Sequence, residues 1–385
     1  MANTVFVLGG GRTGLVAVRD LIQSNVVDHV IIGDIETSKA EKLAKELGST
    51  KIDVVKVDLS NQKDLVKAIR DSQVLINATW YEYNIEVMKA AIEARAHYTD
   101  LGGLFHVTRR QLELDEAARQ AGITAVLGSG ESPGITNIMC ASSAEEMDAV
   151  QEIRIRVGAR EMSTSKSDKL VFPFAVSTIF DEYSKTPVMY VNGQFQEVAP
   201  LSGDEEVEFP APVGRNVCHY SIHSEIATLP LNIKGVKHVD FKLGVSERLY
   251  KAVKPLVDAG LADTTPIEVK GAKISPREYA IAYLSARASD EEPVRYVALR
   301  TEVTGLKDGK RIRQVCEVVG EPSEKIGVRN ATALLTGIGA SITAQLMLKA
   351  QISRRGVVAP ESCIPTSVFI SELEKRKIRI TKKES

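Results

Sequence analysis

A glycine cluster near the start of the chain has the spacing of a dinucleotide-binding loop. Gly9, Gly11 and Gly14 form the pattern G-x-G-x-x-G directly after an apolar run and before a segment with helical periodicity. The first glycine allows a tight turn, the second lets the backbone approach a pyrophosphate, and the third lets helix and strand pack closely. Phosphates would meet the unpaired N–H groups at the positive end of the helix dipole. The pattern predicts a nucleotide site that also includes Arg12 and Thr13.

The sequence also predicts which nucleotide this loop binds. Asp34 follows Gly14 by twenty residues and ends the second apolar run, where a carboxylate accepts hydrogen bonds from the ribose hydroxyls of the adenosine. Ile35 and Glu36 follow Asp34, rather than an arginine, and this second acid would repel a 2′-phosphate. We therefore expect NAD as the cofactor, with NADP less favoured.

Two further strand ends are expected to line the cofactor. Asp58 and Leu59, after the third apolar run, are placed to flank the adenine ring, although Asp58 and Ser60 could equally cap the next helix. The fourth run ends in small residues that would let the dinucleotide pass, namely Asn77, Ala78 and Thr79.

These residues are positioned by an alternation of apolar runs and helix-period segments. The apolar runs lie at 4–9, 29–34, 52–58, 73–78, 97–102 and 123–128. Each of the first five runs is followed by a helical pattern, and these patterns end near 24, 47, 70, 95 and 120. The last of these helices is expected over 107–120. Strands that alternate with helices pair in parallel through crossovers, so the pattern predicts a doubly wound Rossmann sheet.

After Gly158 the pattern changes to hairpins. Asn192-Gly193 and Asp308-Gly309 each separate two alternating runs, which is a strong hairpin signal. Helical segments at 247–261 and 276–287 lie between them, so this half is predicted to be an inserted α+β domain built on an antiparallel sheet. We expect three divisions: a nucleotide domain over 1–130, a substrate and dimerisation domain over 131–336, and a segment over 337–385 that returns to the nucleotide domain.

Composition limits the partners. The formal net charge is −1, and the one basic run, at 375–383, fits a solvated tail, so we expect neither a nucleic-acid nor a membrane partner. The uncharged segment 331–348 is interrupted by glycines, threonines and a glutamine, which favours a buried helix over a membrane span. Four scattered cysteines and the absence of a leader predict a reduced, cytoplasmic protein without a metal site. The remaining expected partners are a small-molecule substrate and further copies of the chain, as a dimer or a dimer of dimers.

Several motifs together resemble the saccharopine reductase and lysine 6-dehydrogenase family. In chain order they are VLGGGRTG, LINATW, HYTDLGG, GSGESPGITN, HSEIATLP and RRGVVAPESCIP. The resemblance covers essentially the whole chain and implies a Rossmann domain interrupted by an α+β domain, with NAD(P)-dependent oxidation of a carbon–nitrogen bond in an amino acid. The length and the lack of an arginine after Asp34 place the chain nearest to the lysine 6-dehydrogenase branch. One departure is that some relatives carry an aspartate near Gly128 or Ser132, where this chain has Glu131.

The chemistry implied by this resemblance needs proton transfer. An alkyl ammonium has a pKa of about 10.4, so a base must take a proton before hydride can leave the carbon, and hydrolysis of the imine needs an acid and a base. Four residues at predicted strand ends or loops are candidates: Tyr98, Asp100, Glu131 and His223. The family resemblance associates a tyrosine at the position of Tyr98 with proton transfer. A turn carboxylate at Asp100, a helix-start carboxylate at Glu131 and a structural His223 are the alternatives.

The other candidate charges are less specific. Arg215, Arg248 and Arg300 could each bind a substrate carboxylate, and surface ion pairs would explain each equally well. The remaining histidines are expected to be structural: His29, His97, His106, His219 and His238.

Three functions follow from these patterns. The first is an NAD-dependent amino-acid dehydrogenase that deaminates the side chain of lysine or a similar diamino acid to a semialdehyde. The second is the reverse type of reaction, the reductive condensation of an aldehyde with an amino acid, as in saccharopine or carboxynorspermidine formation. The third is a non-catalytic NAD-sensing regulator, against which the retained Tyr98, Asp100, Glu131 and His223 argue. A sugar epimerase would show a Tyr-x-x-x-Lys pair, which the stretch after Tyr98 lacks.

Overall fold

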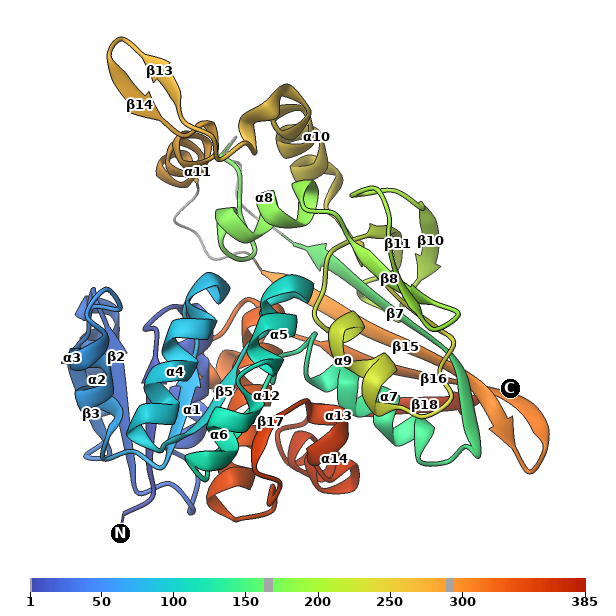
Figure 1. Cartoon of the computed structure of the whole chain (residues 1–385), viewed down its shortest axis with the longest axis horizontal. Coiled ribbons are helices and arrows are strands. Elements are labelled where there is room, and N and C mark those ends of the chain that lie inside the picture. The colour runs from blue at the N-terminus through green and yellow to red at the C-terminus, as the bar shows by residue number, and fades with distance from the viewer. Residues whose placement is uncertain (1, 163–168, 289–293) are drawn as a thin grey trace.

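A parallel seven-stranded sheet forms the first layer of the molecule, with helices on both faces (Figure 1). The computed structural model describes residues 2–162, 169–288 and 294–385. The strand order is β17-β6-β5-β4-β1-β2-β3, which confirms the predicted doubly wound topology. The strands are β1 Thr4–Leu8, β2 His29–Asp34, β3 Ile52–Lys56, β4 Val74–Asn77, β5 His97–Asp100, β6 Thr124–Val126 and β17 Gly356–Val358.

The central strands are apolar because both of their faces are covered. In β1, Val5 and Val7 join the core cluster that includes α1 and α12, whereas Phe6 and Leu8 join a second cluster against α3 and α4. Alternate residues of a strand point to opposite faces, so the run needs apolar residues throughout. The helices of this layer are α1 Arg12–Leu21, α2 Ser38–Leu47, α3 Gln62–Ile69, α4 Asn84–Ala94, α5 Leu104–Leu112 and α6 Asp115–Gln120, with a short 3₁₀ turn, η1, at Tyr81–Tyr83.

The single helix predicted over 107–120 is in fact two helices. The N–H groups of Glu113 and Leu114 bond to the carbonyls of Arg110 and Gln111, three residues back, and this tighter turn ends α5 before α6 begins. The other predicted elements of this half are found within a few residues of their expected bounds.

The second layer is a nine-stranded sheet whose central pair is long. Seven strands follow the order β10-β11-β12-β7-β15-β16-β18, and β8 and β9 pair beside β12. The strands are β7 Ala149–Glu161, β8 Val188–Val191, β9 Gln194–Glu197, β10 Glu205–Glu208, β11 Arg215–Tyr220, β12 His238–Gly244, β15 Arg295–Lys307, β16 Lys310–Gly320 and β18 Ile380–Glu384. The prediction of a purely antiparallel sheet is wrong, because β12 runs parallel to β7. The connection between these two strands includes α8 (Val176–Ser184) and α9 (Glu225–Asn232).

Both predicted hairpins are confirmed. Asn192-Gly193 joins β8 to β9, and Asp308-Gly309 joins β15 to β16. All four residues have positive φ angles, as a two-residue type I′ turn requires.

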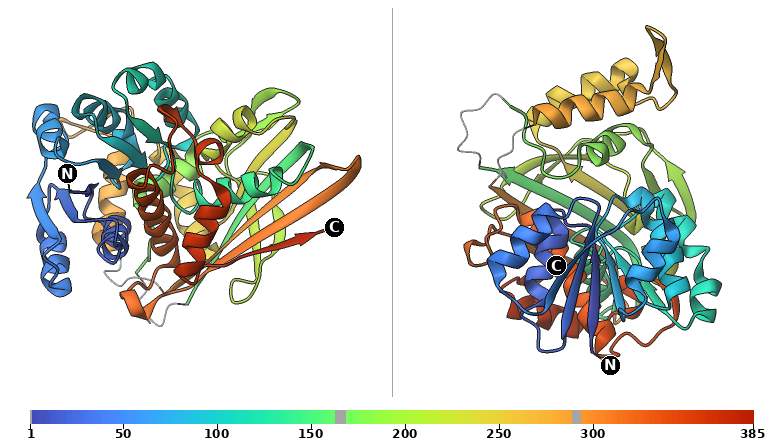
Figure 2. Two further views of the ribbon diagram at one scale, coloured as in Figure 1. Left: turned by 90° about the horizontal axis from the view of Figure 1, so that it is seen from below. Right: turned by 90° about the vertical axis from the view of Figure 1, so that its left-hand side faces the viewer.

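Helices and a separate hairpin complete this half. Helix α10 and helix α11 with the two-stranded hairpin β13–β14 form an arm that projects from the sheet beyond α8 (Figures 1 and 2). The elements are α7 Ile135–Ala144, α8 Val176–Ser184, α9 Glu225–Asn232, α10 Glu247–Leu256, η2 Val257–Leu261, β13 Ile267–Val269, β14 Ala272–Ile274 and α11 Pro276–Arg287.

The carboxyl-terminal segment contributes to both sheets. Strand β17 adds to the parallel sheet beside β6, whereas β18 pairs with β16 in the second sheet. Between them lie α13 Pro360–Cys363 and α14 Thr366–Lys375, after a short 3₁₀ turn, η3, at Glu324–Ile326 and the long helix α12 at Ala331–Leu348. The predicted divisions 1–130, 131–336 and 337–385 stay predictions.

Helix α12 lies at the junction of the two layers. Among the described residues it is the helix long and apolar enough to cross a membrane, but 83% of it is buried inside the structure. A Cβ on Gly337 would lie 2.7 Å from the carbonyl oxygen of Thr13, and a Cβ on Gly339 would lie 2.6 Å from that of Ser129. These close approaches let α12 support both the glycine loop and the loop after β6.

Candidate active site

The glycine loop has the geometry that its spacing predicted. Gly9 has φ +106° and its N–H donates to the Gly33 carbonyl at 2.8 Å. A Cβ on Gly14 would lie 2.0 Å from the Gly9 carbonyl oxygen, so a side chain there would force α1 away from β1. By contrast, a Cβ on Gly11 would meet no atom within 4 Å. Gly11 precedes α1 without a side-chain cap, so the start of this helix is open to a phosphate.

Asp34 lies against this loop at the end of β2. Its Oδ2 accepts a hydrogen bond from the Gly10 N–H, and its Oδ1 accepts one from the Glu36 N–H at 2.9 Å. Each carboxylate oxygen keeps a second lone pair for a ribose hydroxyl. The loop and the acid are therefore held together as one surface, as the twenty-residue spacing predicted.

The next two strand ends lie beside this surface. Asp58 is exposed and accepts from the Ser60 N–H, while the N-cap of α3 is Asn61, so the capping alternative for Asp58 is wrong. Leu59 packs partly against the α3 core cluster. Arg12 is exposed and its guanidinium reaches the Phe172 carbonyl at 3.3 Å.

The end of β4 is small and tightly bonded. Asn77 is buried and its Oδ1 accepts from both the N–H and the hydroxyl of Thr79. A Cβ on Gly9 would lie 2.7 Å from the carbonyl oxygen of Ala78. The path between β1 and β4 is therefore lined by backbone and by short side chains.

Tyr98 and Asp100 are in contact but completely buried. The Tyr98 hydroxyl donates to Asp100 Oδ2 at 2.9 Å, and Gln111 donates to the same oxygen at 2.6 Å. Asp100 Oδ1 accepts from the N–H groups of Gly102 and Gly128, at 3.0 and 2.7 Å. Burial raises the pKa of both groups, and the Asp100 carboxylate raises that of Tyr98 further. Neither side chain has exposed surface, so in this structure the pair fixes the loops after β5 and β6 and has no surface for substrate.

Glu131 is a buried carboxyl group with an unpartnered oxygen. The residue is 8% exposed, and its Oε2 has no hydrogen-bond partner. Burial raises the pKa of Glu131 to about 8, although the Arg295 guanidinium and the Thr332 hydroxyl act in the opposite direction. At neutral pH the group therefore carries a proton that it can donate.

The helix that follows Glu131 begins with N–H groups that already have partners. α7 begins after Gly134, whose N–H donates to the Asn137 side chain, and the N–H groups of Ile135 and Thr136 donate to the carbonyls of Gly130 and Glu131. The first donors of α7 are thus already used by the loop before it.

His223 is oriented by a buried acid from the start of α9. Its Nδ1 contacts Glu225 Oε2, and its ring stacks on Phe241 with the ring centroids 3.8 Å apart. Glu225 is fully buried and also accepts hydrogen bonds from the hydroxyls of Ser132 and Thr136. Burial lowers the pKa of His223, but the Glu225 and Glu182 carboxylates outweigh burial, so the pKa lies above its usual value. A carboxylate that holds one ring nitrogen leaves the other available for a proton.

Two charged residues of this cluster were not among the sequence candidates. Glu182 lies on α8 and Arg295 begins β15, and both are buried. Arg295 donates to Thr332 at 3.1 Å and to Glu161 at 2.8 Å. The pKa of Glu182 is raised to about 7, mainly by burial. Asp181 also raises this pKa, whereas His223 and Arg295 lower it. No local feature of the sequence marks either residue as part of the site, because Glu182 follows another acid, Asp181, and Arg295 begins a strand.

The three proposed carboxylate-binding arginines have other partners. Arg215 pairs with Glu206, Arg300 pairs with Glu302 and Glu317, and Arg248 donates to the Lys169 carbonyl. Arg295 is the arginine beside Glu131 and Glu182.

The structural role predicted for the other histidines agrees with their contacts. His29, His219 and His238 pair with Asp53, Asp204 and Asp240, His97 accepts from the Thr124 N–H, and His106 contacts the edge of Phe105.

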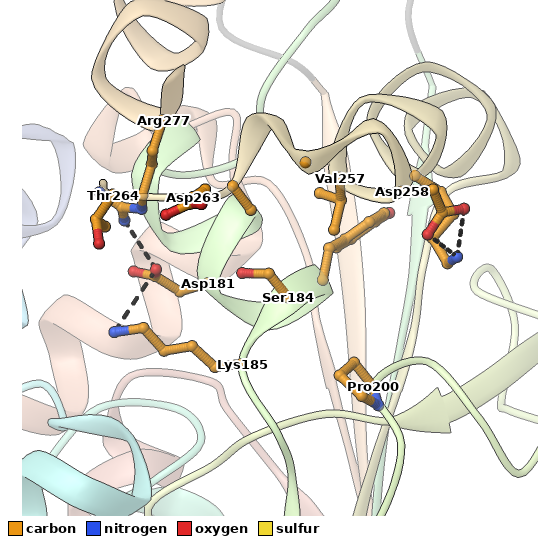
Figure 3. Close-up of a pocket in the computed structure, with 13 residues that line it drawn as sticks. Asp181, Ser184, Lys185, Pro200, Val257, Asp258, Asp263, Thr264 and Arg277 are labelled. Atoms are coloured by element: carbon orange, nitrogen blue, oxygen red, sulfur yellow. Dashed lines mark hydrogen bonds and ion pairs between the residues drawn. The ribbon is translucent and has the colours of Figure 1, made fainter. Parts of the chain in front are cut away.

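Asp181, beside Glu182 on α8, ties the two layers and the arm together. It accepts a hydrogen bond from the Tyr81 hydroxyl of η1 at 2.5 Å and pairs with Arg277 of α11 at 2.8 Å and with Lys185 at 3.7 Å. Figure 3 shows Arg277 and Lys185 converging on this carboxylate at the edge of a cavity of about 600 Å³ between α8 and the arm. The guanidinium of Arg277 also lies 5.6 Å from the ring centre of Trp80, after β4. These contacts fix α8, and with it Glu182, against the nucleotide layer.

The chain is similar to proteins of one family along nearly all of its length. Residues 5–126 match the saccharopine dehydrogenase NADP binding domain, and residues 130–378 match the saccharopine dehydrogenase C-terminal domain.

Curated relatives and a solved structure agree with this match. The chain is 22% identical to a carboxyaminopropylagmatine dehydrogenase from Synechocystis sp., over 96% of this chain and 94% of the relative. It is 24% identical to a carboxynorspermidine synthase from Vibrio cholerae, over 80% of this chain and 79% of the relative. The apo saccharopine dehydrogenase (L-Glu forming) from Saccharomyces cerevisiae has the same fold, with a TM-score of 0.76, 19% identity and full coverage of both chains. The chain therefore belongs to the saccharopine dehydrogenase family, as the resemblance of its motifs implied.

Proposed function

We propose that this protein is an NAD(P)-dependent oxidoreductase that joins an amino-acid semialdehyde to an amine by reductive condensation, and that Glu131 is its acid–base group. One observation carries the proposal: a buried carboxyl group with an unpartnered oxygen, whose pKa burial raises, lies on the loop after β6, at the carboxyl edge of a sheet that bears a dinucleotide loop. Ligands of such sheets bind at this edge. A purely NAD-sensing protein has no need of such a group.

The proton balance of this reaction fits Glu131. The amine nitrogen bonds to the aldehyde carbon, the former carbonyl oxygen leaves as water, and hydride then reduces the resulting imine to a secondary amine. An alkylammonium, an aldehyde, a reduced nicotinamide and one proton give the alkylated ammonium, water and the oxidised nicotinamide. We propose that Glu131 donates the proton with which the hydroxyl group leaves, and takes it back in the oxidative direction. The bound nicotinamide would supply or accept the hydride.

The other candidates support this step in different ways. His223, held by Glu225, is proposed to accept the proton that the substrate ammonium loses before its nitrogen attacks. Tyr98 and Asp100 are proposed as positioning residues, because their hydrogen bonds hold the loops around Glu131.

The nature of the amine is argued from charge and from the relatives. Saccharopine formation would require at least two free arginines for its carboxylates, whereas Arg295 is the arginine found beside Glu131 and it is already paired with Glu161. Two of the curated relatives are named for carboxylated polyamines. We therefore favour a diamine or polyamine as the amine partner. The lysine 6-dehydrogenase activity that we expected first uses the same chemistry and stays a prediction.

The cofactor, the assembly and the location are proposed from the sequence. The matched family is described as NADP-binding. Asp34 lies against the glycine loop and a second acid, Glu36, follows two residues later, so a 2′-phosphate would meet negative charge and we propose NAD for this chain. We further propose a homo-oligomer in the cytoplasm with no nucleic-acid or membrane partner.

The proposal is tested by the absorbance of reduced nicotinamide with purified protein. We expect NADH to be oxidised when a short α-amino acid semialdehyde and 1,3-diaminopropane are both present, and NADPH to be used less well. Reduction of NAD by L-lysine at alkaline pH, with no aldehyde added, would instead support a lysine dehydrogenase. Binding of NADH without turnover in either direction would favour the sensor.

A further inference from the structure

A small cavity lies between α8, α10 and the end of β12, and Glu182 forms part of its wall. Its volume is about 30 Å³, which is room for one or two water-sized groups. Its walls include Phe174, Ile179, Leu243 and Leu249, and its two charged groups are Glu182 and Arg295. An apolar slot of this size with a carboxylate in its wall fits the end of an alkylammonium chain.

We infer that Glu182 is the specificity-determining residue that binds the terminal, non-reacting ammonium group of the amine substrate in this cavity. The inference rests on the proposed function, which identifies the reaction. The chemistry of the cavity does not depend on that function.

Every other charge around Glu182 is already paired within the described residues. Arg295 pairs with Glu161, and Asp181 pairs with Arg277 and bonds to Tyr81. His223, which faces Glu182 from the loop before α9, contacts Glu225 instead. Glu182 itself is 6% exposed and lines the cavity, and it makes no hydrogen bond or ion pair with the residues described, 2–162, 169–288 and 294–385. The cavity therefore gives a cation a place beside a carboxyl group that has no direct partner.

The positive charge of Arg295 is balanced by another residue. Its Nη1 donates to the Glu161 carboxylate, and its Nε donates to the Thr332 hydroxyl. Glu182 is the charged group of the cavity wall without such a direct partner among the described residues, so the cavity favours an ammonium.

Binding of an ammonium here has a measurable proton signature. Burial raises the pKa of Glu182 to about 7, so the empty site holds a proton on this carboxyl group at pH 6. An ammonium beside it favours the carboxylate, so the proton leaves to solvent when the diamine binds. From a pKa of about 7, the release is about 0.9 proton per diamine at pH 6 and about 0.1 at pH 8.

The first experiment is a calorimetric titration of the full chain with 1,3-diaminopropane, without aldehyde, in two buffers of different ionisation enthalpy. We expect proton release at pH 6 that falls at pH 8. Glu182→Gln keeps the shape of the protonated carboxyl group. We expect this variant to show no proton release and to bind 1,3-diaminopropane at least tenfold more weakly. Asp263→Asn, an exposed acid of the cavity on the other side of α8, is the matched control and should change neither.

The second experiment separates binding from proton transfer. With semialdehyde and NADH, Glu182→Gln should raise the KM for diaminopropane at least tenfold and leave the KM for aldehyde and the kcat within about threefold. Glu182→Asp should give an intermediate KM.

The outcomes separate this inference from the proposed reaction. Diamine binding with unchanged proton release in Glu182→Gln, or a loss of kcat at constant KM, would overturn the inference. If the calorimetric result holds but no NADH is oxidised with any aldehyde, the ammonium site stands and the proposed reaction fails.

Discussion

The raised pKa of Glu131 makes a prediction about stability that needs no substrate. In the folded protein this carboxyl group titrates near 8, against an ordinary value of 4.5. Between those values the folded state keeps a proton that the unfolded state releases, so the free energy of unfolding falls as pH rises from 4.5 to 8 and does not recover above 8. Glu131→Gln cannot titrate and should lose this pH dependence.

The magnitude follows from the size of the shift. Three pH units at 1.36 kcal/mol each give about 4 kcal/mol between pH 5 and pH 8. At about 2.1 cal/mol/K per residue, a chain of 385 residues has an unfolding entropy of about 0.8 kcal/mol/K, so 4 kcal/mol corresponds to about 5 °C in Tm.

The assay is differential scanning calorimetry of both proteins at the two pH values. The wild-type Tm should fall by about 5 °C more than the Tm of Glu131→Gln on going from pH 5 to pH 8. Glu113→Gln, an exposed acid after α5, is the control and should follow the wild type. If Glu131→Gln shows the same fall as the wild type, then Glu131 ionises normally and the acid–base argument loses its basis.

Four other predictions concern the cofactor loop, the positioning network and assembly. Gly11→Ala should keep the wild-type Tm but weaken NADH binding at least tenfold by fluorescence titration, whereas Gly14→Ala, which clashes with Gly9, should lower both. Asp34→Ala should raise the KM for NAD at least tenfold and reduce the preference for NAD over NADP. An unchanged ratio of the two KM values would show that this acid does not bind the ribose hydroxyls. Asp100→Asn should lower the Tm by several degrees because the single amide oxygen cannot accept the four hydrogen bonds that the two carboxylate oxygens accept, and normal melting would contradict the network. Light scattering should give a dimer or tetramer mass, and a monomer mass would remove the proposed assembly.

The nucleotide layer could be predicted because its signals are local. The glycine spacing, the acid at the end of β2 and the alternation of runs each depend on residues close together in the chain. Tyr98 shows where this reasoning stops. A residue at a strand end can point to solvent or to the core, and β5 places Tyr98 on the same face as Phe6 and Leu8, in the α3 and α4 cluster. Tyr98 and Asp100 are two residues apart and share a face of β5, and the helices cover that face completely.

The substrate side of the site could be predicted only in part. Glu131 and His223 were recognised from their motifs, but Glu182 and Arg295 come from α8 and β15, more than a hundred residues apart. Their meeting depends on the packing of α8 against α10 and α11 and on the pairing of β15 with β7. No local pattern encodes such a contact, and sequence patterns did not distinguish Arg215, Arg248 and Arg300 from arginines in surface ion pairs.

The central claim is that Glu131 donates the proton in a condensation that consumes reduced nicotinamide. Its most direct test is the initial rate of NADH oxidation by wild type and Glu131→Gln, with semialdehyde and diaminopropane added singly and together. We predict oxidation by the wild type only with both substrates, and a rate at least about 100-fold lower in the variant with unchanged NADH binding. Oxidation with the aldehyde alone, or an equally active Glu131→Gln, would contradict the account.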